Sequence, residues 1–481
     1  MSSLKHHYDN RWLAMGLLCM GALMIVLDVT IVNVALPSIR ADLKFDDVAL
    51  AWVVNAYMLI FGGFLLLGGR LGDIYGHRTV FLTGLAVFTA ASLACGLAGS
   101  QAFLLVARGI QGLGGAVVDA VSLSLILNLF TESNDRTKAM GVYGFVCSGG
   151  GALGALLGGV LTGTFNWHWV FLVNVPVGIA VFAACWKLLP SHAGEAADRK
   201  HLDVGGAVTV TLALLLAVYA TIKGNQVGWV SIQTLSLLGV AVLVFGVFLF
   251  IESHVKKPLV PLAMFRLRNL AVSSVAGSLW SMAMFAWFFL SALYMQLVLG
   301  FTPLQIGMAF LPSNLIMAIM SLGFSAKLVM RFGIKRPLFV GLMFAAGGLL
   351  LFARAPVDGT LVRDILPGML LLGIGAGVAF NPILMAAMSE VPESESGLAS
   401  GLVNTAFMLG GSLGLAVLAS VAAARSAGLA AGGADHFGAL TGGYQAAFLC
   451  GACFALLAAL MGVFLLRIPS APANAAAQVA H

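Results

Sequence analysis

Fourteen apolar segments, most of them close to 20 residues long, dominate this chain of 481 residues. A helix of about 20 apolar residues spans the hydrocarbon core of a bilayer, which is roughly 30 Å thick. Asp, Glu, Lys and Arg make up only 9% of the residues, against roughly 25% in an ordinary soluble domain. The sequence therefore predicts an all-α polytopic membrane protein with 14 transmembrane helices, and it excludes a disordered chain, a disulfide scaffold and a soluble enzyme. The segments lie at 12–36, 48–68, 79–98, 102–129, 139–163, 170–189, 204–222, 231–251, 270–298, 303–325, 338–354, 365–388, 397–422 and 445–466.

Basic residues are unevenly distributed over the loops between these segments. Most of the 25 Lys and Arg residues fall in segments on the same side of the membrane as the amino terminus. Because loops rich in Lys and Arg stay in the cytoplasm, we expect both termini to be cytoplasmic. The first segment is too long for the apolar core of a signal peptide, so we expect it to remain as a helix. The basic residues expected on the opposite side are Arg40, Lys44, Lys223, Arg354, Arg363 and Arg425.

An internal repeat appears when the two ends of the chain are aligned with an offset of about 260 residues. The run Gly150–Gly154 matches Gly410–Gly414, and Gly112–Gly115 is similar to Gly373–Ala376. The repeat predicts two pseudo-symmetric six-helix bundles, with two unrepeated helices between them, in the order six, two and six. Duplicated halves with a substrate bound between them near the midplane are a transporter architecture. The expected divisions are 12–189 for the first bundle, 190–269 for the inserted helices with cytoplasmic linkers, 270–466 for the second bundle and 467–481 for a flexible cytoplasmic tail.

Three ionisable residues lie deep inside apolar segments, where charges are costly and mark a transport pathway. Asp28 and Arg108 have positions along their helices that allow them to share a depth and to form a pair. Asp119 is then an acid without a basic partner, which needs a proton or a positively charged substrate. Arg108, Gly112, Gly115 and Asp119 follow one helical stripe, which we expect to face a water-filled cavity. We assign Asp28, Arg108 and Asp119 to proton coupling; the alternative is that these charges only fix helix packing.

Other polar and aromatic side chains at membrane depth are candidates for substrate binding. Trp280 and Trp287 lie on one face of a predicted helix, where they could form an adaptable pocket or stack on cations. Contact with lipid or packing inside the bundle is the alternative for this stripe. The candidate substrate-binding residues are Asn33, Asn55, Tyr57, Asp119, Trp280, Trp287, Asn381, Asn404 and Phe407.

A charged loop and a glycine-rich helix are candidates for conformational roles. Gly69, Asp73, Gly76 and Arg78 belong to a cytoplasmic loop that could bridge helix ends and act as a gate; the alternative is a solvated charge cluster. The glycines of the fifth segment let a neighbouring backbone approach closely, which is also a general device of tight helix packing. The candidate residues on this helix are Gly150, Gly154, Gly158 and Gly159.

These motifs resemble the major facilitator superfamily, and within it the fourteen-span drug:proton antiporters of the EmrB/QacA type. Leu27–Pro37 is similar to the first-helix motif of that family, Gly69–Arg78 to its cytoplasmic loop signature and Arg108–Gly112 to its fourth-helix motif. Three further stretches resemble this subfamily in particular, at 167–176, 258–266 and 300–307. The resemblance implies a proton-coupling pair at Asp28 and Arg108, a gate at Asp73 and Arg78, and an antiporter motif on the fifth segment.

Three positions depart from the pattern of that family. Ala155 stands where the antiporter motif has Pro, which puts a bend of this helix in doubt. Phe407 stands where the thirteenth helix often has Arg. Asp119 stands where an apolar residue or Pro is common, and it adds a negative charge that favours a cationic substrate or a second proton site.

The expected function is a proton-coupled antiporter that exports amphipathic, cationic drugs or antiseptics by alternating access across a bacterial inner (plasma) membrane, with antibiotic resistance as the consequence. The alternative is a dedicated exporter of one endogenous metabolite, lipid or antibiotic. No nucleophile, metal cluster or phosphate-binding loop is apparent, so we do not expect an enzyme, a metal or a cofactor. A channel or sensor is a further class, and the repeat with its embedded acids argues against it. Expected partners are protons, a small-molecule substrate and the lipid bilayer but no nucleic acid; a periplasmic adaptor with an outer-membrane duct is a candidate partner, and we expect a monomer.

Overall fold

The chain is all-helical in a computed structural model, which describes residues 2–130, 132–189, 203–255, 258–392 and 395–467. Its internal contacts group the chain into two units. Unit 1 comprises Met1–Leu259 and Phe301–Met308, and unit 2 comprises Val260–Gly300 and Ala309–His481. The inserted helices therefore group with the first bundle. Most of the predicted tail, residues 468–481, lies outside the described residues.

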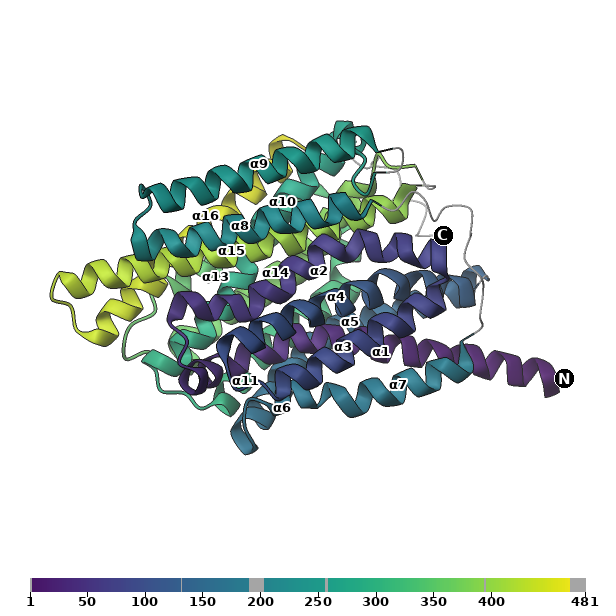
Figure 1. The fold of residues 1–481 in the computed structure, drawn as a ribbon, viewed down its shortest axis with the longest axis horizontal. Coiled ribbons are helices and arrows are strands. Elements are labelled where there is room, and N and C mark those ends of the chain that lie inside the picture. Colours follow the sequence, from purple (N-terminus) through teal and green to yellow (C-terminus); the bar gives the residue numbers. More distant parts are fainter. Residues whose placement is uncertain (1, 131, 190–202, 256–257, 393–394, 468–481) are drawn as a thin grey trace. The chain divides into compact units, whose positions relative to one another are not determined.

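Unit 1 contains a bundle of long helices and a helical hairpin (Figure 1). The helices α2 and α3 pack against α4, while α1 packs against α5. The hairpin of α8 and α9 contacts α2 through α8. The helices are α1 (Ser2–Leu43), α2 (Asp47–Tyr75), α3 (His77–Gly96), α4 (Gln101–Leu129), α5 (Ser133–Thr164), α6 (Trp169–Leu172), α7 (Asn174–Leu188), α8 (Val204–Val227) and α9 (Ile232–His254).

Unit 2 forms a second bundle, in which α10 packs against α14, α15 and α16, and α13 packs against α14 and α16. A short 3-10 turn, Leu262–Arg266, precedes it and places Met264 in an apolar cluster with residues of α14 and α15. Single π-helical turns at Tyr294–Val298, Met320–Phe324 and Leu361–Ile365 interrupt or flank the helices. The helices are α10 (Arg268–Leu293), α11 (Pro303–Ile319), whose residues up to Met308 belong to unit 1, α12 (Ser325–Phe332), α13 (Lys335–Phe352), α14 (Leu366–Met388), α15 (Ser396–Ala431) and α16 (His436–Phe464).

Twelve helices among the described residues are long and apolar enough to cross a membrane, so the chain is a multi-pass membrane protein. The predicted count of fourteen is not supported. The predicted segment 139–163 lies within the helix α5, where the apolar stretch found among the described residues is the shorter Leu153–Thr164. The predicted segment 303–325 is helical throughout, as α11, the π-helical turn Met320–Phe324 and the start of α12, and the apolar stretch found there, Pro303–Ile319, has 17 residues.

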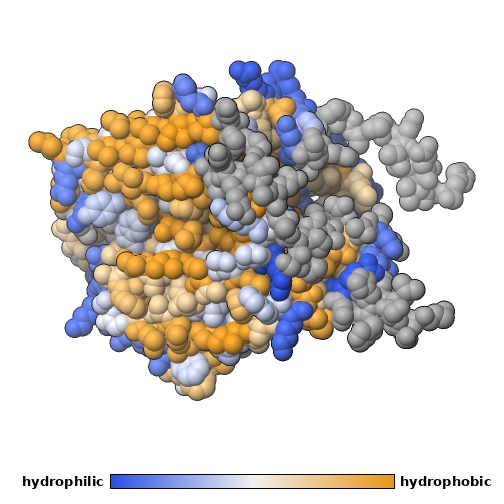
Figure 2. All heavy atoms as spheres, turned by 45° about the vertical axis from the view of Figure 1, so that its right-hand side comes forward, coloured by the Kyte–Doolittle hydropathy of each residue, from blue (hydrophilic) through white to orange (hydrophobic). Residues whose placement is uncertain are grey.

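Large apolar side chains cover much of the molecular surface, as the orange areas of Figure 2 show. On α9 they point outward almost all around the helix, for example at Val242 and Phe250. A soluble protein rarely exposes contiguous apolar patches larger than a few hundred Å². This surface is therefore suited to lipid.

Paired glycines make equivalent close approaches inside each unit. A β-carbon at Gly112 of α4 would collide with the backbone of Tyr57, and one at Gly373 of α14 would lie 2.5 Å from the carbonyl oxygen of Ser313. Similarly, Gly114 approaches the backbone of α3, and Gly375 approaches the backbone of α13. The repeat found in the sequence thus corresponds to the same helix contacts in both bundles.

The glycines of α5 face two different neighbours. Gly150, Gly154 and Gly158 face α1, where a β-carbon at Gly158 would lie 2.7 Å from the carbonyl oxygen of Ile31. Gly159 instead faces the start of α11, with the carbonyl oxygen of Pro303 at 2.8 Å. The helix continues without interruption through Ala155, in keeping with the absence of Pro at this position. The predicted close approach at these glycines is confirmed, whereas their role in antiport stays a prediction.

The contact at Gly158 predicts a stability difference between two substitutions on the same helix. We expect Gly158→Ala to lower the thermal stability of the purified protein in detergent, by about 1–3 kcal/mol, because the new methyl group meets backbone that cannot rotate away. Gly163→Ala is the matched control, since its β-carbon would lie 3.9 Å from Leu304, an ordinary contact. Equal melting temperatures for the two variants would contradict this interpretation.

Candidate functional site

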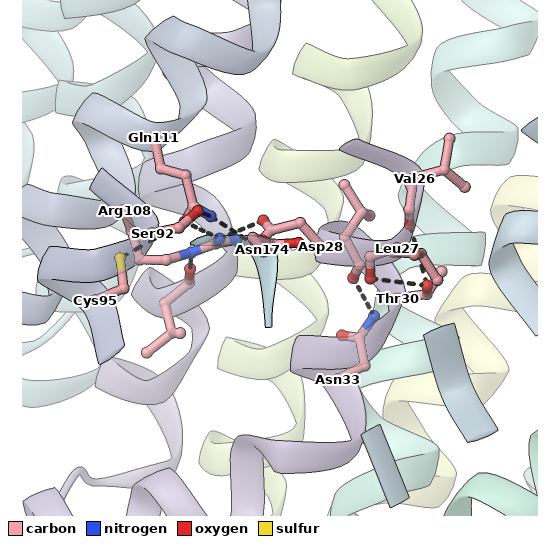
Figure 3. A network of polar contacts seen from close by, with 12 residues as sticks. Val26, Leu27, Asp28, Thr30, Asn33, Ser92, Cys95, Arg108, Gln111 and Asn174 are labelled. Carbon is pink, nitrogen blue, oxygen red and sulfur yellow. Dashed lines mark hydrogen bonds and ion pairs between the residues drawn. The ribbon is translucent and has the colours of Figure 1, made fainter. Parts of the chain in front are cut away.

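An ion pair joins α1 to α4 in the interior of unit 1 (Figure 3). Arg108 Nη1 donates a hydrogen bond to Asp28 Oδ2 at 2.5 Å. The two side chains are 1% and 0% exposed, respectively. The predicted pairing of Asp28 and Arg108 is therefore present in the structure. A buried pair of this kind requires good geometry and additional hydrogen bonds to offset the loss of hydration.

The additional hydrogen bonds come from three neutral side chains, which bond to the ion pair or to each other. Gln111 Nε2 donates to Asp28 Oδ1 at 2.7 Å and to Ser92 Oγ at 2.8 Å, while its Oε1 accepts from Arg108 Nη1 at 2.7 Å. Asn174 Nδ2 donates to Asp28 Oδ1 at 3.4 Å. The carboxylate of α1 is thus held by groups from α4 and α7, and Figure 3 shows these residues converging on it. Removing its charge would weaken several contacts between these helices at once.

Sequence reasoning assigned no role to Gln111, Ser92 or Asn174. Gln111 follows Arg108 by three positions, so both lie on the same face of α4, and this spacing was a signal that could have identified it. Ser92 and Asn174 belong to other helices, and nothing in their local sequence indicates where α3 and α7 meet Asp28.

Arg108 keeps other partners besides Asp28. Its Nε donates to the backbone carbonyl of Val53 on α2 at 2.9 Å. Its guanidinium carbon lies 4.4 Å from the centre of the Tyr57 ring and 5.6 Å from that of Phe171. Rings at such distances attract a cation. The guanidinium is therefore attached to α2 as well, besides its pairing with Asp28 of α1.

We expected the glycines between Arg108 and Asp119 to face a water-filled cavity. The structure places Tyr57 in the space beside them instead. The backbone of Tyr57 lies against Gly112, and its hydroxyl oxygen would be 2.8 Å from a β-carbon at Gly115. Small residues on α4 serve the close approach of α2. Asp119, one turn further along, is half-buried. Within the described part of the chain, no side chain donates a hydrogen bond to it.

The remaining predicted residues of unit 1 have local partners. Asn33 Nδ2 donates to the carbonyl of Val29 on its own helix at 3.0 Å, and Asn55 is fully buried. In the predicted gating loop, Asp73 lies 3.5 Å from His77, whereas Arg78 donates to the carbonyl of Trp186 and lies over its ring. Gly76 adopts a positive φ of 88° directly before α3. Asp73 and Arg78 therefore have separate partners, and their function as a gate stays a prediction.

The predicted residues of unit 2 form more than one group. Trp287 packs against Phe310 and Phe352, with ring centres 5.9 and 6.4 Å away. Phe407 packs edge-on against Phe285 and Phe380, at 6.0 and 5.7 Å. Asn381 Nδ2 donates to the carbonyl of Ser321 at 2.8 Å, and Asn404 is half-buried.

Trp280 and Trp287 share a further property. They are 1% and 2% exposed, yet neither indole N–H has a hydrogen-bond acceptor among the described residues. A buried donor without an acceptor costs about 1–3 kcal/mol. These two groups are consequently suited to donate to a molecule that enters unit 2.

Trp280 occupies the position in unit 2 that Asp28 occupies in unit 1. In unit 1, Gly150 and Gly154 of α5 contact Val26 and Thr30 of α1, on either side of Asp28. In unit 2, Gly410 and Gly414 of α15 contact Ser278 and Met282 of α10, on either side of Trp280. By the same comparison Arg108, four residues before Gly112, corresponds to Met369, four residues before Gly373. The ion pair of the first bundle is thus replaced by apolar and aromatic side chains in the second.

We expect removal of one member of the ion pair to lower the stability of the protein more than removal of both members. We expect Arg108→Leu to lower the stability of the purified protein by about 3–5 kcal/mol, because it leaves a buried carboxylate without its counter-charge. The double variant Asp28→Leu with Arg108→Leu should recover most of this loss. Thermal unfolding of the two variants in detergent checks this expectation, and losses that simply add would contradict it.

Comparison with known proteins is consistent with this fold. The family model of the Major Facilitator Superfamily matches residues 18–415 of this chain. A puromycin resistance protein of Streptomyces alboniger is 37% identical, over 89% of this chain and 84% of its own length. A cephamycin export protein of Amycolatopsis lactamdurans is also 37% identical, over 88% of each chain. A tetracenomycin C resistance and export protein of Streptomyces glaucescens is 35% identical, over 86% of this chain and 76% of its own.

Solved structures show the same fold at lower sequence identity. A variant of the nucleoside transporter NupG superposes with a TM-score of 0.67 at 12% identity, covering 95% of this chain and all of its own. A bacterial homologue of the human lysosomal transporter Spinster gives a TM-score of 0.67 at 15% identity, covering 96% and 99%. The chain therefore belongs to the Major Facilitator Superfamily of membrane transporters.

Proposed function

We propose that this transporter exports amphipathic, cationic compounds in exchange for protons. The observation that carries the proposal is the fully buried Asp28–Arg108 pair, which connects helices of one bundle through a group that can be protonated. Acids at membrane depth mark proton and substrate pathways. The relatives named for antibiotic resistance or export support efflux as the direction of transport.

The contacts of Asp28 suggest how a proton acts on the bundle. Protonation removes the charge that Arg108 and Gln111 stabilise, and so weakens the attachment of α1 to α4. The partners that Arg108 then keeps on α2 are the carbonyl of Val53 and the ring of Tyr57. A proton that moves inward down the membrane potential supplies about 2.3 kcal/mol per 100 mV for this change. Asp119 would receive the cationic group of the substrate.

A dedicated exporter of one metabolite or antibiotic is the second candidate. It is favoured by relatives that are named for a single compound, such as puromycin, cephamycin or tetracenomycin C. The two unpaired indole donors also fit a substrate that carries hydrogen-bond acceptors. A narrow range of exported compounds would distinguish this function from multidrug efflux.

We further propose that the protein is a monomer in the inner membrane with both termini in the cytoplasm, as the distribution of Lys and Arg favours. The hairpin of α8 and α9, which lies between the two bundles in the sequence, supports assignment to the EmrB/QacA type. An adaptor that links the transporter to an outer-membrane duct is a further candidate partner.

Proton exchange can be tested with the protein in liposomes that contain a pH-sensitive dye. Adding lipophilic cations should cause proton movement in the wild type, and Asp28→Asn should reduce it at least about tenfold, because the amide cannot exchange a proton. Asp435→Asn is the matched control, since Asp435 only caps the start of α16 and Asn caps helices equally well. A proton signal that persists in Asp28→Asn would move coupling to another residue.

The negative charge of Asp119 leads to a prediction about which compounds are transported, according to their charge. Replacing it by Asn should weaken export of cationic compounds about tenfold or more, because an opposite charge near the substrate is lost, while export of neutral compounds by the same variant changes little. Uptake of a panel of cationic, neutral and anionic compounds into inverted vesicles measures this difference. Equal loss for all three classes would contradict a role of Asp119 in recognising charge.

A further inference from the structure

Tyr57 of α2 contacts Arg108 at one end of the charged stripe on α4 and reaches Gly115, toward its other end. Its ring lies over the guanidinium of Arg108, with 4.4 Å between the guanidinium carbon and the ring centre. Its hydroxyl points along α4 to Gly115, one helical turn before Asp119. Asp28, Arg108 and Asp119 are the charged groups close enough to act on it.

The position of Tyr57 is fixed by close packing. Its backbone lies against Gly112, where any β-carbon would collide with it. Phe61 stacks on its ring at 5.7 Å between ring centres, with an angle of 23° between the planes. The ring can therefore tilt but cannot move away from α4. A force on the hydroxyl would be transmitted to the ring face that holds Arg108.

The hydroxyl of Tyr57 is unsatisfied in this structure. The residue is 1% exposed, and its oxygen has no hydrogen-bond partner among the described residues. Buried hydroxyl groups of tyrosine usually have such a partner. Asp119, half-buried and likewise without a hydrogen-bond donor, lies about 6 Å further along the helix axis than Gly115. A group that donates hydrogen bonds could bind the carboxylate and the tyrosine oxygen together.

We propose that Tyr57 is the positioning residue that couples substrate binding at Asp119 to the Asp28–Arg108 pair. This inference rests on the proposed function and extends it. A substrate ammonium or amino group bound at Asp119 also donates to the Tyr57 oxygen and holds the ring in place. The ring then keeps the guanidinium beside Asp28. The positive charge favours the carboxylate form, so that the carboxylic acid of Asp28 releases its proton to solvent when the substrate binds.

The pH dependence of substrate affinity measures this coupling. If proton and substrate exclude each other one for one, the Kd of the substrate rises up to tenfold for each pH unit below the titration of Asp28. Ethidium is a suitable probe, because it is a fluorescent cation with amino groups that donate hydrogen bonds. Its Kd can be measured on the purified full-length protein in detergent across a pH series.

Tyr57→Phe keeps the ring and removes only the hydroxyl. We expect the Kd of ethidium to change by less than about threefold per pH unit in this variant, with a Kd at high pH within about tenfold of the wild type. Gly115→Ala should act in the same direction, because its methyl group would occupy the place of the hydroxyl oxygen. Tyr294→Phe is the matched control: Tyr294 is equally buried, and its hydroxyl donates to the carbonyl of Pro356 in unit 2. It should keep the pH dependence of the wild type.

The outcomes separate the two proposals. A wild type whose ethidium affinity does not depend on pH would overturn proton antiport itself, and the coupling role of Tyr57 with it. A pH-dependent wild type with an unchanged Tyr57→Phe variant would overturn only the role of Tyr57. Loss of the pH dependence in Tyr294→Phe as well would show a general effect of altered packing, and would also overturn that role.

Discussion

A carboxylate and a guanidinium buried together at membrane depth constrain the first bundle. Neither Asp28 nor Arg108 can be desolvated alone at an acceptable free energy. Each donor and acceptor around them therefore has to be satisfied, and Gln111, Ser92 and Asn174 lie where they do this. The positions of α1, α3, α4 and α7 follow from that requirement, because each contributes a side chain to one hydrogen-bond network.

Close backbone approach is the second constraint, and it explains the many glycines. Helices in lipid gain little from hydrophobic association, so they depend on van der Waals contact and on hydrogen bonds between helices. Gly112 allows α2 to lie so near α4 that Val53 and Tyr57 reach Arg108. The same approach of Gly373 to Ser313 in unit 2 serves no ion pair among the residues that the structure describes. Packing geometry is therefore repeated in the two units, while the chemistry that it positions is not.

Hydropathy and spacing predicted most of the membrane-spanning helices, though not their number, and the Asp28–Arg108 pair, because apolar length and the cost of a buried charge act locally on the chain. The π-helical turn inside the predicted segment 303–325 was missed, since such a turn leaves no clear trace in hydropathy. Gly112 and Gly115 were interpreted as the wall of a cavity, because the sequence does not show that Tyr57 of another helix fills this space. Ser92 and Asn174 were missed for the same reason: a polar residue in an apolar helix indicates a partner, but not which helix supplies it.

The two bundles differ in the side chain that occupies their equivalent central positions. A duplicated chain offers two equivalent central positions, and here one holds Asp28 while the other holds Trp280. An acid changes its charge with pH, whereas an indole does not, so a proton can alter the contacts of α1 but not those of α10. The unsatisfied N–H of Trp280 instead offers a fixed hydrogen-bond donor. On the function proposed here, the first bundle responds to protons and the second presents a surface of constant charge to the substrate. Competition between proton and cation then requires a connection within the first bundle alone, and Tyr57 reaches from Arg108 to Gly115, one helical turn before Asp119.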